Sequence, residues 1–144
     1  MNSFKHQFLL AMPHLIDPNF EKGLTFICEH SKEGALGLVV NKPLDLTFAE
    51  LTSQIGIHLL DTSRTQVPIF AGGPVHNERG FVLHTSEGKW SSSIALGEGI
   101  YLTTSLDILE ALAAGAGPDE FIITLGCASW QAGQLEQEFL DNAW

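Results

Sequence analysis

Apolar and polar residues alternate in short runs along most of the chain, and Gly, Pro, Asn or Ser residues separate one run from the next. Runs with this period are typical of β-strands, whose successive side chains point to opposite faces. We predict strands over Gln7–Met12 (closed by Pro13), Leu24–His30, Ala35–Val40, Val67–Ala71, Gly80–Thr85, Ser93–Leu96, Gly99–Thr103 and Glu120–Cys127.

Two short connections between these strands contain typical turn residues. Ser31-Lys32-Glu33-Gly34 joins two predicted strands, and Gly34 supplies the positive φ that a tight hairpin needs. Pro43 holds the preceding Lys42 in an extended conformation, so we expect the strand before it to end in a loop.

Three other segments show helical spacing. The first begins with a capping-box sequence, in which Thr47 precedes Glu50 by three residues. Its apolar face comprises Phe48, Leu51, Ile55 and Leu59.

The second predicted helix begins at Thr104, where Asp107 complements the free amides, and it ends at Gly115. The third spans Gln131–Leu140, and Ser129 is its expected N-cap. Strands and helices follow one another in mixed order, with several strands in hairpin-like pairs. This order predicts an α+β fold rather than a doubly wound sheet.

The composition is that of one globular domain, residues 1–144. Hydrophobic residues make up 44% of the chain and charged residues 17%, which excludes wholesale disorder. The longest apolar runs fall far short of the ~18 residues of a membrane-spanning helix, and the run near the N-terminus is too short for a signal peptide. We therefore expect a cytoplasmic protein in which Cys28 and Cys127 are reduced thiols.

The charge of the chain is strongly acidic. Seventeen acidic residues against seven basic ones give a net charge of −10, and no Lys or Arg follows Lys89. A nucleic-acid surface needs several cations to displace the counterions of the phosphates. We therefore expect neither nucleic acid nor an anionic membrane as a partner.

Several short segments are distinctive when their order and spacing are taken together. They are Phe8-Leu9-Leu10-Ala11-Met12-Pro13, Cys28-Glu29-His30 followed by Glu33-Gly34-Ala35-Leu36-Gly37, Asn41-Lys42-Pro43, Gly72-Gly73-Pro74-Val75, Gly80-Phe81-Val82-Leu83-His84, Thr104-Ser105-Leu106-Asp107-Ile108-Leu109 and Gly133-Gln134-Leu135-Glu136. The ordered set resembles the AlgH/YqgE family of bacterial proteins over nearly the whole chain. The resemblance implies a mixed, largely antiparallel bifurcated sheet, curled into a pseudo-barrel with about three flanking helices. It also implies a cytosolic protein whose molecular activity is not established.

The chain departs from the family pattern in two places. It reads Gly126-Cys127-Ala128-Ser129-Trp130 where the family tends to read Gly-Tyr-Ala-Gly-Trp, so a thiol mechanism at Cys127 would not be general to the family. The family also usually continues beyond the position of Trp144, and we expect this chain to lack that C-terminal extension. The family's label of transcriptional regulator is not supported by any DNA-binding motif in this sequence.

The turn predicted between the last strand and the last helix is the strongest catalytic candidate. A Cys127 thiol or a Ser129 hydroxyl there would face the free amides of a helix N-terminus. His84 or His30 would serve as the base, and Glu29 would orient it. A hydrolase elbow, however, has Gly where Ser129 stands, so a buried Cys127 that acts as a small apolar residue is the alternative.

Other residues are candidates for binding a partner. Gly72-Gly73-Pro74 either presents amides to an anion or forms a tight turn, since no Lys-Ser or Lys-Thr of a phosphate loop follows it. Trp130 and Gln134 are both expected to line a pocket in one interpretation. In the other, Trp130 packs over the start of the helix and Gln134 faces solvent. Glu29 is either a rim carboxylate or a partner of Lys42. The predicted contact groove comprises Glu29, Asn41, Gly72–Val75 and Trp130.

A metal site is a weaker hypothesis. Cys28 and His30 are two residues apart on a predicted strand, so they are expected to share a face to which His76 or His84 would add a ligand. No pair of these residues has the spacing of a known zinc motif. We therefore expect structural histidines, with no metal and no cofactor.

Three functions remain open, in this order. The first is a non-enzymatic regulatory or interaction protein, monomer or homodimer, that binds a protein or small-molecule partner. The second is a hydrolase or thiol enzyme centred on Cys127 or Ser129. The third is a nucleic-acid-binding transcriptional regulator, which the small number of basic residues disfavours.

Overall fold

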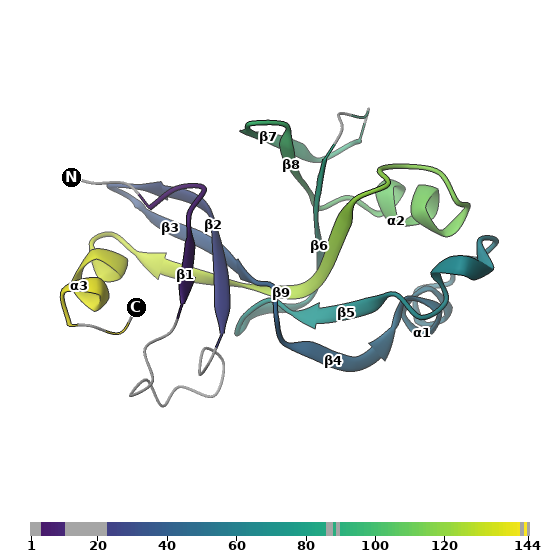
Figure 1. The fold of residues 1–144 in the computed structure, drawn as a ribbon, viewed down its shortest axis with the longest axis horizontal. Helices are drawn as coiled ribbons and strands as arrows, with labels where there is room; N and C mark the ends of the chain where they lie inside the picture. Colours follow the sequence, from purple (N-terminus) through teal and green to yellow (C-terminus); the bar gives the residue numbers. More distant parts are fainter. Residues whose placement is uncertain (1–3, 11–22, 86–87, 89, 142, 144) are drawn as a thin grey trace.

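The computed structural model describes residues 4–10, 23–85, 88, 90–141 and 143. Over these residues nine strands and three α-helices form an α+β fold (Figure 1). The strands are β1 (Phe8–Leu10), β2 (Leu24–Ser31), β3 (Gly34–Val39), β4 (Pro43–Thr47), β5 (Pro68–Ala71), β6 (Val75–Thr85), β7 (Ser93–Gly97), β8 (Ile100–Thr103) and β9 (Phe121–Gln131). The helices are α1 (Phe48–Gln54), α2 (Leu106–Ala113) and α3 (Gln134–Leu140), with a 3₁₀ turn at Thr62–Arg64.

β9 organises the sheet because three other strands pair with it. The strand order is β1-β2-β3-β9-β6-β8-β7, in which β6 is antiparallel to β9, and β5 is parallel to β9 and antiparallel to β4. β5 and β3 follow each other along the edge of β9 that β6 leaves free, so the sheet divides into two arms (Figure 1). This largely antiparallel, bifurcated and curled sheet confirms the predicted fold class.

Three glycines allow the chain to cross β9 between β5 and β6. A Cβ atom on Gly72 would lie 2.2 Å from the carbonyl oxygen of Gly126, and one on Gly73 would lie 2.4 Å from the carbonyl oxygen of Cys127. Gly126 itself has a φ of +83°, which an L side chain rarely adopts. The backbone at Gly72 and Gly73 therefore lies so close to the backbone of β9 that neither position has room for a side chain.

The buried apolar side chains form three clusters, each between a different set of strands and helices. One cluster packs α1 and α2 against β5, β6 and β9, and a second packs α3 against β1, β2, β3 and β9. The third fills the interior of the pseudo-barrel. It comprises Phe26, Cys28, Leu38, Phe81, Leu83, Leu96, Leu102 and Cys127.

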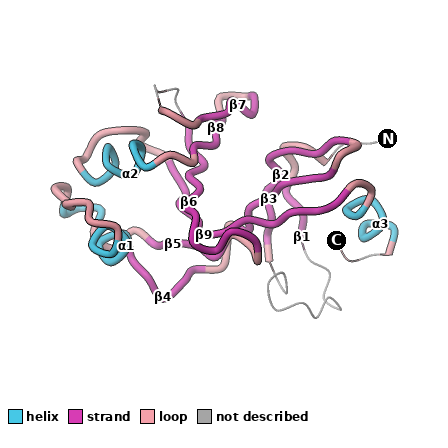
Figure 2. The backbone as a smooth tube through the Cα atoms, turned by 180° about the vertical axis from the view of Figure 1, so that it is seen from behind, coloured by secondary structure: helices cyan, strands magenta, loops and turns pink. Residues whose placement is uncertain are grey.

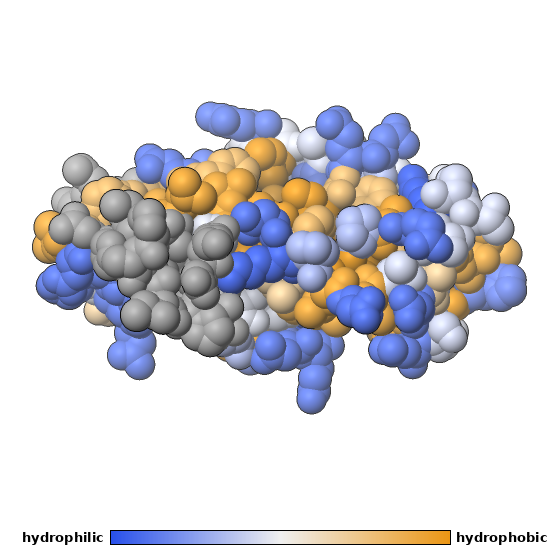
Figure 3. Space-filling view, turned by 60° about the horizontal axis from the view of Figure 1, so that its bottom comes forward, coloured by the Kyte–Doolittle hydropathy of each residue, from blue (hydrophilic) through white to orange (hydrophobic). Residues whose placement is uncertain are grey.

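The helices divide between the two ends of the molecule. α1 and α2 lie at one end and α3 lies at the other (Figures 1 and 2), where Phe4 and Ala143 pack against the same apolar cluster as α3. On the face shown in Figure 3, hydrophilic residues interrupt the apolar patches. Among the described helices, none has the length and apolar character needed to cross a membrane.

Most predicted elements occur where the pattern placed them. The Ser31–Gly34 hairpin is confirmed, with Gly34 at a φ of +139°, and so is the capping box of Thr47 and Glu50. The residues predicted to end the first strand, 11–13, lie outside the described residues. The loop predicted before Pro43 is confirmed, because β3 ends at Val39 and residues 40–42 lie outside any strand; Pro43 then begins β4, where the first residue of a strand tolerates proline.

The end of β9 is the main correction. The predicted strand ends at Cys127, but β9 continues to Gln131 because β3 offers its residues Gly34–Gly37 as hydrogen-bonding partners. α3 consequently begins at Gln134 rather than Gln131, and its N-cap is Gly133, not Ser129.

A hollow at the end of the pseudo-barrel

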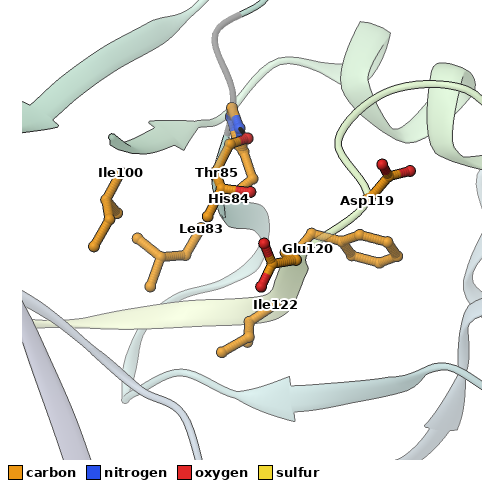
Figure 4. Close-up of a pocket in the computed structure, with 8 residues that line it drawn as sticks. Leu83, His84, Thr85, Ile100, Asp119, Glu120 and Ile122 are labelled. Atoms are coloured by element: carbon orange, nitrogen blue, oxygen red, sulfur yellow. Dashed lines mark hydrogen bonds between the residues drawn. The ribbon is translucent and has the colours of Figure 1, made fainter. Parts of the chain in front are cut away.

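A hollow of about 440 Å³ lies where β6 ends beside β8 and the start of β9 (Figure 4). The strand register builds it from two rows of residues. In the first row Thr85 pairs with Ile100, and its amide donates a hydrogen bond to the Glu120 carbonyl at 3.2 Å. In the second row Leu83 pairs with Ile122. Residues of both rows line one concave surface.

The side chains of this surface have two kinds of chemistry. Leu83, Ile100 and Ile122 form an apolar wall, and the Glu120 carboxylate projects to the same side (Figure 4). Asp119 lies at the far rim and points away from these side chains. A volume of this size at the mouth of a barrel is typical of a site for a small molecule.

His84 also borders the hollow, but its ring takes part in a separate set of contacts. The ring stacks on Tyr101 at 5.8 Å between centroids. Its Nε2 lies 2.7 Å from Thr103 Oγ1, and its Nδ1 lies 3.0 Å from the Thr85 carbonyl oxygen. These contacts fix the ring in the buried space between β6 and β8, so His84 contributes to the structure of the wall.

The catalytic turn predicted at Cys127 does not exist. Cys127 lies within β9, buried in the interior of the pseudo-barrel, and no helix N-terminus follows it directly. Burial raises the pKa of the Cys127 thiol, against a smaller opposing effect of Arg79. Burial likewise raises the pKa of the Cys28 thiol to about 12, and both cysteines are free. A reactive thiolate is therefore not favoured at either position.

Ser129 is exposed on β9, but neither proposed base reaches it. Within the described part of the chain, no hydrogen bond joins His84 or His30 to Ser129 or Cys127. His30 is fully buried. Its Nδ1 accepts a hydrogen bond from the Phe4 amide at 2.8 Å, and its Nε2 lies 3.1 Å from Glu136 Oε1 of α3.

The predicted shared face of Cys28 and His30 is also wrong. The register of β2 against β3 shifts between Ile27 and Glu29, which is a β-bulge. Cys28 therefore faces the interior of the pseudo-barrel, whereas His30 faces α3. Over the residues that the structure describes, no group of three His, Cys, Asp or Glu side chains is placed to hold a metal ion.

The structure separates the residues of the predicted contact groove. Glu29, Ser129 and Trp130 line a shallow depression of about 220 Å³. Asn41 lies in the connection between β3 and β4, and its Oδ1 accepts a hydrogen bond from the Leu24 amide at 2.8 Å. Gly72 is buried against β9, as described above.

The side chains around the shallow depression are largely engaged. Glu29 pairs with Lys5 at 3.6 Å rather than with Lys42. The Trp130 Nε1 donates to Glu138 Oε1 at 3.1 Å, and Gln134 Nε2 donates to the other carboxylate oxygen at 2.9 Å. Gln134 Oε1 also accepts a hydrogen bond from the Gln131 amide of β9 at 2.9 Å, so Trp130 and Gln134 both fasten α3 to β9.

The sequence patterns indicated His84 but none of the other residues that line the hollow. Leu83, Ile100 and Ile122 read as ordinary strand residues, and only the pairing of three strands brings them together. The one available signal was the spacing of Glu120 and Ile122, which places a carboxylate on the same strand face as an apolar residue.

Comparisons with known proteins agree with this fold. The AlgH-like family model matches residues 8–144. A UPF0301 protein of Chromohalobacter salexigens is 49% identical over all of this chain and 78% of its own length, and one of Pseudomonas putida is 57% identical over 97% of this chain and 74% of its own length. The solution structure of the AlgH protein from Pseudomonas aeruginosa superposes with a TM-score of 0.84 at 46% identity, covering 99% of this chain and 76% of that one. A protein of Corynebacterium diphtheriae, at 19% identity and a TM-score of 0.72, shares the fold over 95% of this chain and 71% of its own.

Proposed function

The chain belongs to the AlgH-like family, and we propose that it is a non-enzymatic regulatory protein of the bacterial cytoplasm that binds a small molecule in the hollow between β6, β8 and β9. The observation that carries this proposal is the hollow itself. It combines an apolar wall of Leu83, Ile100 and Ile122 with a single convergent carboxylate, Glu120. An apolar pocket with a few placed polar groups is the usual form of a ligand site.

The arrangement of the nucleophiles supports binding rather than covalent catalysis. A nucleophilic mechanism needs a base within hydrogen-bond reach of the attacking oxygen or sulfur. The two cysteines are buried in apolar surroundings, and the described contacts of His84 are with Thr103, Tyr101 and a backbone carbonyl. Among the described residues that line the hollow, no nucleophile is paired with a base in this way, which favours a binding site.

A thermal-shift screen with a small-molecule library tests the proposal. A ligand present at about one hundred times its Kd adds roughly 2.7 kcal/mol to the stability, which raises the melting temperature by several degrees. The site is identified with Ile100→Trp, which fills the hollow. Ile94→Trp, on exposed β7 of the same hairpin, is the matched control.

We expect compounds that stabilise the wild type and Ile94→Trp but not Ile100→Trp. A library without any stabilising compound would overturn the proposal. Stabilisation that persists in Ile100→Trp would place the ligand elsewhere and overturn it as well.

A further inference from the structure

The hollow also indicates which ligand it accepts, and we infer that it binds a small apolar molecule that carries a cationic amine. This inference rests on the proposed function and specifies the chemistry of its ligand. The surroundings of Glu120, the charge of the chain and the size of the hollow all favour such a ligand.

The Glu120 carboxylate has no partner in the described part of the protein. It makes no ion pair or side-chain hydrogen bond there, although it stands beside an apolar wall. Glu120 is exposed, and an apolar ligand that covers the wall would exclude part of the solvent beside the carboxylate, which strengthens its attraction for an ammonium group on that ligand. Glu120 therefore favours a cation at this position.

The arginines of the described chain already have other contacts. Arg64 Nη1 donates to the carbonyl oxygens of Leu112 at 2.8 Å and Ala116 at 3.0 Å, and the guanidinium lies over the Phe121 ring. Arg79 donates to Thr104 Oγ1 at 3.2 Å. Neither side chain neutralises Glu120.

The charge of the whole chain acts in the same direction. The net charge is −10, and the C-terminal segment after Lys89, which supplies Glu120, Ile122 and Ile100, contains no Lys or Arg. A surface of one sign concentrates ligands of the opposite sign and repels those of the same sign. The hollow is thus complementary to a cation and unfavourable for a carboxylate or phosphate.

The volume of about 440 Å³ suits a small molecule whose apolar part covers Leu83, Ile100 and Ile122 while its amine reaches Glu120. Both parts are needed. The apolar wall supplies most of the binding free energy through burial, and the carboxylate selects the charge of the ligand.

Isothermal titration with three eight-carbon probes separates these contributions. Octylammonium, octanoate and 1-octanol share one apolar chain and differ in the charge of the head group. We expect octylammonium to bind at least about tenfold more tightly than octanoate, with 1-octanol between them. Glu120→Gln should weaken octylammonium binding by roughly tenfold and leave 1-octanol unchanged.

Two variants control for non-specific charge effects. Glu110→Gln removes the same charge from the exposed face of α2, and Glu78→Gln removes it from an exposed position of β6 that does not line the hollow. Both should keep the octylammonium affinity within about threefold of wild type.

The outcomes of the titration are distinct. Equal or tighter binding of octanoate or 1-octanol would overturn the inference and leave the proposed function standing. Octylammonium binding that ignores Glu120→Gln would also overturn it. Binding of a peptide of alternating leucine and arginine, without binding of octylammonium, would overturn the assignment to a small molecule. If none of the probes binds to the wild type or to Ile100→Trp, the result would count against the proposed function itself.

Discussion

Gly72 illustrates at the residue scale why part of this sequence cannot vary. Its Cβ position lies 2.2 Å from the Gly126 carbonyl oxygen, and both backbones are held by strand pairing. Gly72→Ala should therefore lower the free energy of unfolding by about 3 kcal/mol or more, measured by urea denaturation. Gly80→Ala is the control, because its Cβ would have an ordinary contact of 3.8 Å with Leu109. A Gly72→Ala protein as stable as Gly80→Ala would contradict the described crossing.

The two cysteines allow a second test at the residue scale. Burial raises the pKa of both thiols, that of Cys28 to about 12, so neither forms thiolate readily in the folded protein. At pH 8 we expect Ellman's reagent to react at least about tenfold more slowly with the native protein than with the protein in denaturant. Rapid reaction of Cys127 in the native state would revive the thiol-enzyme hypothesis.

At the scale of single elements, the sequence predicted the features that neighbouring residues determine better than the features that a distant strand determines. The capping box of α1 and the Gly34 turn depend on neighbouring residues alone, and both were predicted correctly. The extension of β9 to Gln131 depends on β3, almost a hundred residues earlier in the chain, so local spacing could not show it. The catalytic turn at Cys127 failed for the same reason.

The start of α2 provides a prediction about pH. Although desolvation opposes it, hydrogen bonds from Ser105 and Ser91 hold the pKa of Asp107 below its usual value. A depressed pKa adds stability above the unfolded pKa of about 3.9, and this stability is lost as the pH falls through the folded pKa. Asp107→Ala should cost about 1 kcal/mol at pH 7 and progressively less below about pH 4.

Urea titrations of Asp107→Ala across this pH range provide the measurement. Glu110→Ala serves as the control, since Glu110 is exposed on the same helix. A stability difference between wild type and Asp107→Ala that stays constant down to about pH 2 would show that the carboxylate charge has no role.

At the scale of the molecule, the fold class followed from the order of elements and from the family resemblance, and the hollow followed from neither. Leu83, Ile100, Glu120 and Ile122 meet because β6 joins β8 on one side and β9 on the other. Such a meeting is a property of the whole sheet. Sequence patterns identified His84 and Glu29 because their side chains are chemically distinctive, yet His84 contacts Thr103 across β6 and β8, and Glu29 forms an exposed ion pair with Lys5.

The net charge of the molecule leads to a prediction about nucleic acid. With a charge of −10 the chain should not change the fluorescence anisotropy of a labelled DNA duplex at roughly 10 µM protein and about 0.15 M salt. Binding that weakens steeply with added salt would show a local basic surface and favour the transcriptional regulator instead.

The most direct test of the proposed site is an amide NMR titration of the wild-type protein with octylammonium. We predict saturable shifts centred on residues 83–85, 100 and 120–122, and their loss in Ile100→Trp. Shifts centred on residues 29–36 and 129–130 would place the ligand in the shallow depression instead. Either that result or an unchanged spectrum would contradict the conclusion that the hollow between β6, β8 and β9 is the binding site.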